Sequence, residues 1–116
     1  VDGGQEVMDG IGSDIADPST HETAYPGTPL AALHSFQLDG LVPLSQKYGT
    51  LKMPLLLFTS VQDHVVDPGN SDALAAAYGG PVERVMLERS YHVATQDYDK
   101  DTIFAASVEF ISRVTA

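Results

Sequence analysis

The chain has 116 residues, an apolar content of 43% and no cysteine, which fits one small domain or part of a larger one and excludes disulfides and thiolate chemistry. Six basic and sixteen acidic residues give a formal charge of -10, which argues against a nucleic-acid partner because neutralising phosphates requires clustered cations. The longest apolar run, Met53 to Phe58, is too short to span a membrane, and no signal-peptide pattern is visible, so we expect a cytoplasmic protein.

The first part of the chain, residues 1–49, predicts an irregular stretch followed by short helices. Residues 1–29 are rich in Gly, Asp, Ser, Thr and Pro without a periodic apolar pattern, so we expect an irregular stretch that is mobile or packs on something outside this chain. Leucines at helical spacings then predict two short helices, over 29–38 and 40–48, interrupted near Asp39-Gly40 and ended by Gly49.

Residues 50–116 predict an α/β core in the order strand, helix, strand, helix. The apolar run from Met53 to Ser60 is typical of a buried strand, and a helix follows the turn-forming stretch from Asp67 to Asp72. Residues 82–88 predict a second strand, and the last helix is expected to begin near Asp99. This order favours a parallel pair of strands with flanking helices.

Two buried strands are too few for a complete sheet, because both edges would expose unpaired backbone groups. The chain also begins with Val1 rather than Met. We therefore expect the 116 residues to be a processed, proteolysed or deliberately cut part of a larger protein.

Two ionisable residues follow the predicted strands. Asp63 comes shortly after the first strand and His92 shortly after the second, twenty-nine residues later. Catalytic side chains of α/β enzymes lie in such loops, and adjacent parallel strands bring neighbouring loops together. An aspartate there can fix the tautomer of the imidazole and stabilise the imidazolium that forms during catalysis. Taken singly, however, an aspartate after a strand is more often a turn or cap residue, and a histidine there is more often structural.

The segments MPLLLFTSVQDHVVDPGNSDAL and VERVMLERSYHVATQDYDKDTI resemble the C-terminal region of the α/β-hydrolase superfamily, nearest to bacterial carboxylesterases and monoacylglycerol-lipase-like enzymes. The resemblance covers about residues 50–115, and it implies that residues 1–49, which resemble such enzymes only loosely, are a lid-like or cap-like segment. It implies a serine carboxylester hydrolase in which Asp63 is the acid and His92 the base of a catalytic triad, with a small-molecule ester as substrate and no cofactor.

The nucleophile of that family lies in a G-x-S-x-G motif upstream of the acid, and this chain has no such motif. The nearest stretch, Gly69 to Ala73, follows the acid, and its Ser71 is better explained as a residue in the first turn of a helix. No oxyanion-hole loop is recognisable either. The resemblance therefore implies that this chain alone is inactive and that its partner is the N-terminal half of the hydrolase or a second copy of itself.

Other interpretations stay open. His64 beside Asp63 could suggest a metal site, but neighbouring positions rarely converge on an ion and no third ligand is evident, so we expect no metal. The chain could also be a catalytically inert interaction or structural module derived from the hydrolase fold, which docks a partner through its unpaired strand edge.

Overall fold

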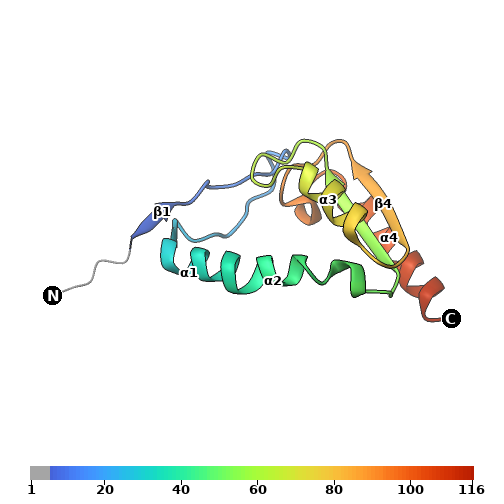
Figure 1. Cartoon of the computed structure of the whole chain (residues 1–116). Coiled ribbons are helices and arrows are strands. Elements are labelled where there is room, and N and C mark those ends of the chain that lie inside the picture. The colour runs from blue at the N-terminus through green and yellow to red at the C-terminus, as the bar shows by residue number, and fades with distance from the viewer. Residues whose placement is uncertain (1–5) are drawn as a thin grey trace.

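The computed structural model describes residues 6–116, so the first five residues of the predicted segment 1–49 lie outside the described part. The described chain measures 58 × 39 × 24 Å. A parallel strand pair with its helices forms one part, and an N-terminal segment followed by a helical run extends from it (Figure 1).

The strand pair consists of β3 (Leu55–Ser60) and β4 (Val82–Leu87), paired in parallel from Leu55↔Val82 to Ser60↔Leu87. Helix α3 (Gly69–Ala77) connects the two strands, and helix α4 (Lys100–Val114) follows β4. Both strands, both helices and the parallel pairing agree with the sequence prediction. Because the strands are parallel, the loops that leave their carboxyl ends lie at one edge of the sheet.

The buried core is small. Leu87, at the end of β4, is 2% exposed, and Ile103, on α4, is 8% exposed. The polar residues Thr59, Ser60, Ser90 and Asp97 are also buried. The best-packed region of the described chain therefore includes the carboxyl end of the sheet, which is the end that carries Asp63 and His92.

The helical run differs from the prediction of two separate helices. Helix α1 (Leu30–Ser35) continues directly into a π-helical segment (Phe36–Leu41) and then into α2 (Val42–Ser45), so the expected interruption at Asp39-Gly40 is wrong. A proline removes one backbone donor and crowds the carbonyl four residues earlier. The wider π turn directly before Pro43 accommodates this crowding without ending the run.

The expected helix stop at Gly49 is also wrong. Helix α2 ends at Ser45, and Gly49 lies within a 3-10 turn, Tyr48–Thr50. Gly12 is the residue with positive φ among residues 6–116, so Gly49 does not provide a left-handed cap. At α3, Ser71 lies in the first turn, as the sequence suggested.

The N-terminal segment is more ordered than its composition suggested. Strands β1 (Val7–Asp9) and β2 (Gly27–Pro29) pair antiparallel, with Val7 opposite Pro29. The stretch between them reaches the loops that follow β3 and β4, where the backbone of Val93 donates to the carbonyl of Asp14 at 3.2 Å. Residues 14–17 of the segment therefore pack on the chain itself, whereas the large side chains of Val7, Met8, Ile11 and Tyr25 remain exposed. Within the described chain no helix is both long and apolar enough to cross a membrane.

Candidate active site

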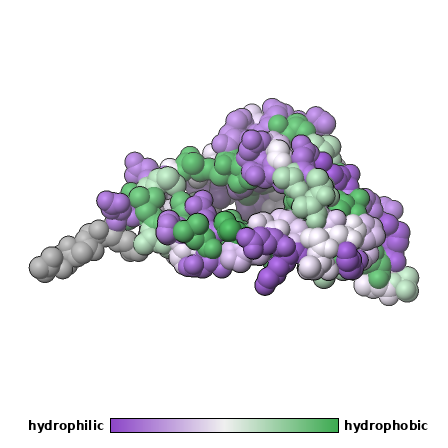
Figure 2. Space-filling view, in the orientation of Figure 1, coloured by the Kyte–Doolittle hydropathy of each residue, from purple (hydrophilic) through white to green (hydrophobic). Residues whose placement is uncertain are grey.

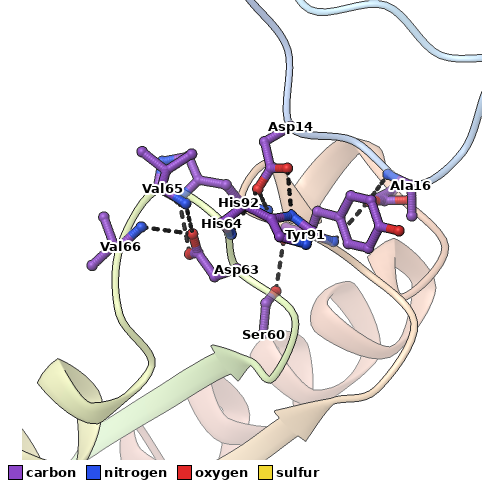
Figure 3. A network of polar contacts seen from close by, with 10 residues as sticks. Asp14, Ala16, Ser60, Asp63, His64, Val65, Val66, Tyr91 and His92 are labelled. Carbon is purple, nitrogen blue, oxygen red and sulfur yellow. Dashed lines mark hydrogen bonds and ion pairs between the residues drawn. The ribbon is translucent and has the colours of Figure 1, made fainter. Parts of the chain in front are cut away.

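The structure brings Asp63 and His92 into direct contact. Asp63 lies in the loop after β3 and His92 in the loop after β4, and Nδ1 of His92 is 2.9 Å from Oδ2 of Asp63 (Figure 3). The Asp63 side chain is 15% exposed and the His92 side chain 38% exposed. One ring nitrogen of His92 is thus held by a largely covered carboxylate while the imidazole remains open to an incoming group.

The other carboxylate oxygen of Asp63 shapes its own loop. Oδ1 accepts hydrogen bonds from the backbone N–H groups of Val65 and Val66, each at 2.8 Å. An aspartate that bonds the amides two and three residues ahead forms a side-chain turn. The turn function and the contact with His92 therefore coexist, one on each oxygen.

These contacts determine the ionisation of Asp63. Partial burial opposes its charged form, but the N–H donors of Val66 and Val65 and the His92 side chain outweigh burial and hold the pKa of the Asp63 carboxyl below its usual value. Asp63 is thus a carboxylate at neutral pH, the form needed to accept a proton-bearing Nδ1 and to balance an imidazolium charge.

A second aspartate–histidine pair lies beside the first. Nδ1 of His64 is 2.8 Å from Oδ1 of Asp14, and the His64 ring meets the Tyr91 ring edge-on at 4.5 Å. The His64 side chain is 60% exposed, whereas the Asp14 side chain that holds it is 12% exposed. Among residues 6–116 no group of three ligand-type side chains could hold a metal ion.

A third aspartate, Asp97, organises the backbone around His92. Its carboxylate accepts hydrogen bonds from the N–H groups of Ala16, Asp17, Tyr91 and Tyr98 at 2.7 to 3.0 Å. Burial opposes its ionisation, but these donors hold the pKa of the Asp97 carboxyl below the ordinary value. Asp97 is 1% exposed and links the N-terminal segment to the loop that carries His92.

Two cavities lie next to His92. One, of about 500 Å³, is lined by Asp63 and His92 together with the apolar side chains of Phe58, Leu87 and Ile103. The other, of about 600 Å³, lies between β1, β2 and the loops. Figure 2 shows the molecule hollowed between the N-terminal segment and the helical run. His92 lines both cavities, whereas His64 lines neither, so the His92–Asp63 pair is the one placed to meet a small molecule.

Sequence reasoning did not identify Asp14 or Asp97. Asp97 lies between the strand predicted over 82–88 and the last predicted helix, and Asp14 lies in the stretch 1–29 that the sequence predicts to be irregular. Their partners are mostly backbone N–H groups, some as many as 81 residues away in the chain. Since every residue except proline carries such a group, no pattern of side chains in the sequence indicates these contacts.

The parallel strands and flanking helices are those of the C-terminal portion of an α/β-hydrolase fold. A solved structure from a study of LipS and LipT, two metagenome-derived lipolytic enzymes, matches 92% of this chain with a TM-score of 0.85 and 39% identity. This chain covers 44% of that structure's chain.

Among curated proteins, the chain is similar to the thermostable monoacylglycerol lipase of Bacillus sp. (strain H-257), with 40% identity over 116 residues. The match includes 96% of this chain and spans 46% of that lipase, about half of its length. No family model matches the chain. The relatives are thus lipolytic enzymes, and the chain corresponds to less than half of each.

Proposed function

We propose that the chain supplies the acid and base of a serine carboxylester hydrolase of the esterase or lipase type. The contact of 2.9 Å between Asp63 and His92, which both line a cavity with mainly apolar walls, carries this proposal. The resemblance to lipolytic enzymes over about half of their length supports it. The nucleophilic serine and the oxyanion donors then belong to an N-terminal half with a G-x-S-x-G motif.

The chemistry follows from the two nitrogens of His92. Asp63 holds Nδ1 in its protonated form, which leaves Nε2 to take the proton of the serine hydroxyl as that oxygen attacks the ester carbonyl. The same proton passes to the leaving alcohol when the tetrahedral intermediate collapses. Water then attacks the acyl-enzyme with His92 again acting as the base, which releases the acid and regenerates serine.

We also propose that residues 1–49 form a lid-like segment over the site and that residues 50–116 form the catalytic core. The N-terminal strands line the cavity of about 600 Å³ together with His92, which supports this division. A third cavity, of about 840 Å³, lies between the helical run, the loop after β3 and α3. An ester with an apolar acyl group suits the mainly apolar walls.

The test is to join this chain to the N-terminal half of the Bacillus lipase and to assay a short p-nitrophenyl ester. His92→Ala removes the general base, so we expect turnover to fall by at least about 10³-fold. His34→Ala is the matched control, since His34 is an exposed residue on α1 and lines neither cavity next to His92. Turnover that is equal in the two variants would contradict the proposal.

A catalytically inert interaction module is the alternative. It is favoured by the β3–β4 sheet, which has two strands in the described chain and could therefore pair with a strand of another chain along an edge. The same experiment separates the two functions. A joined protein that folds and binds ligand at the cavity but hydrolyses no ester, with or without His92, supports the inert module.

A further inference from the structure

The carboxylate of Asp14 lies where the two catalytic loops meet. Asp14 is 8% exposed, although it belongs to the N-terminal segment rather than to the α/β core. Its Oδ2 accepts hydrogen bonds from the backbone N–H of His64 at 3.1 Å and from that of His92 at 3.0 Å. Its Oδ1 is 2.8 Å from Nδ1 of His64 (Figure 3).

One oxygen atom therefore holds the backbone of both loops. His64 directly follows Asp63, so its amide nitrogen moves with the acid, and the amide nitrogen of His92 moves with the base. The ladder between β3 and β4 ends at Ser60↔Leu87, one step before the loops diverge, with Val61 donating to the carbonyl of Leu87. Beyond that point, side chains must fix the separation of the loops.

Besides the Asp63–His92 contact, two side chains link the loops. Gln62 donates to the carbonyl of Glu88 at 2.6 Å, and the buried Ser60 donates to the carbonyl of Tyr91 at 2.8 Å. That carbonyl belongs to the same peptide group as the His92 N–H, so Ser60 holds this peptide through its oxygen. Asp14 differs from both because one of its oxygen atoms accepts from the N–H groups of His64 and His92 together.

We propose that Asp14 is a positioning residue that holds the Asp63 and His92 loops in register, so that the N-terminal segment is a structural part of the active site. This inference rests on the proposed function of the Asp63–His92 pair. Asp14 does not contact the reacting atoms; it acts through the backbone of the loops. A misplacement of about 1 Å at a catalytic group can lower the rate by about 10²-fold.

The kinetic test uses the joined enzyme and pairs Asp14 with Asp17, an acid of the same segment whose carboxylate bonds Ser19 alone among residues 6–116. We expect Asp14→Ala to lower kcat by about 10²-fold with little change in KM. We expect Asp14→Asn to recover most of this loss, because an amide oxygen can still accept from both backbone N–H groups. Asp17→Ala should behave as the unmodified enzyme.

A spectroscopic test on the 116-residue chain does not depend on turnover. In ¹⁵N-labelled chain we expect the ring signals of His92 to report a proton on Nδ1, and the His92 amide to exchange slowly with solvent. Asp14→Ala should average the two tautomers and speed that exchange at least about tenfold, whereas Asp17→Ala should leave both readouts unchanged.

The outcomes separate the two proposals. Signals and kcat in Asp14→Ala that match those of Asp17→Ala would overturn the positioning role even if His92 proves essential for turnover. If Asp14→Ala does not fold, the decision rests on Asp14→Leu, which keeps a side chain of similar shape but has no acceptor: a variant that matches Asp17→Leu in kcat and in His92 exchange overturns the positioning role. Failure of the proposed function instead shows as turnover that is insensitive to His92→Ala.

Discussion

Asp63 uses its two carboxylate oxygens for two different purposes. Oδ1 closes a turn with the amides of Val65 and Val66, and Oδ2 faces Nδ1 of His92. The turn fixes the direction in which Oδ2 points. The hydrogen bonds that stabilise the loop thus also orient Asp63 for its proposed role as the acid of a triad. Similarly, Asp14 and Asp97 are buried acids whose backbone partners surround the same histidine.

The buried Asp97 carboxylate predicts a pH dependence of stability. Folding lowers the pKa of the Asp97 carboxyl, which is about 3.9 in the unfolded chain. Between the two pKa values the unfolded chain therefore binds more protons than the folded chain. The stabilisation is fully present above about pH 4 and is lost as the pH falls through the folded-state pKa.

Asp97→Asn removes the charge that the N–H donors stabilise and should lower the free energy of unfolding by about 2 kcal/mol at neutral pH. The Asp97→Asn variant should also lose less of its free energy of unfolding as the pH falls below about 4. Urea unfolding between pH 2.5 and 7 measures both effects, with Asp72→Asn as the control because that side chain is 71% exposed. An acid limb as steep in the Asp97 variant as in the control contradicts the prediction.

At the scale of the elements, two glycines differ in the space around them: Gly40 has room for a side chain, and Gly79 has none. Gly40 lies in the π-helical segment, where an added Cβ would meet only the Phe36 side chain, at 3.7 Å. Gly79 follows α3, and an added Cβ there would overlap the backbone of Gly49. The backbone of Gly79 also donates to the carbonyl of Tyr48 at 3.1 Å.

Alanine substitutions at these two positions should therefore differ in sign. Gly40→Ala should stabilise the chain by about 0.5–1 kcal/mol, because alanine loses less backbone entropy in a helical segment. Gly79→Ala should destabilise it by about 1–3 kcal/mol, because the backbone of the Tyr48–Thr50 turn has to move. Thermal unfolding of both variants provides the measurement. A destabilising Gly40→Ala would instead favour the interrupted helices that the sequence suggested.

At the scale of the whole molecule, helix α4 exposes an apolar surface that could contact another part of the protein. Phe104, Val108 and Ile111, at spacings of four and three residues, are 54%, 66% and 58% exposed and lie on one stripe of the helix. The chain spans 46% of the curated relative's length, so the proposed N-terminal half offers a natural cover for this stripe.

Val108→Asp should weaken the association of the chain with a separately expressed N-terminal half by at least about tenfold, because a charge would be buried in an apolar contact. The variant should leave the stability of the chain alone within about 0.5 kcal/mol. Thr102→Asp, an exposed residue on the opposite side of α4, adds the same charge as a control. Titration calorimetry of the two halves measures the affinities, and equal values for both variants would exclude this stripe as the interface.

The sequence by itself determined the parallel strand pair, helices α3 and α4, and the two loops that carry Asp63 and His92. These depend on local apolar patterns and turn residues, which are legible along the chain. It did not determine the continuity of the helical run through Gly40, because the π turn before Pro43 breaks the usual helical period.

Only the tertiary structure showed that the N-terminal segment belongs to the candidate site. Asp14 and Asp97 accept hydrogen bonds from backbone N–H groups that are distant in sequence. Almost every residue carries such a group, so no sequence motif predicts these contacts. The same structure gave His92, rather than His64, the position beside both cavities. The proposed roles of Asp63 and His92 come from the family resemblance of the segments that carry them, whereas the buried carboxylates that hold their loops became evident only from the packed chain.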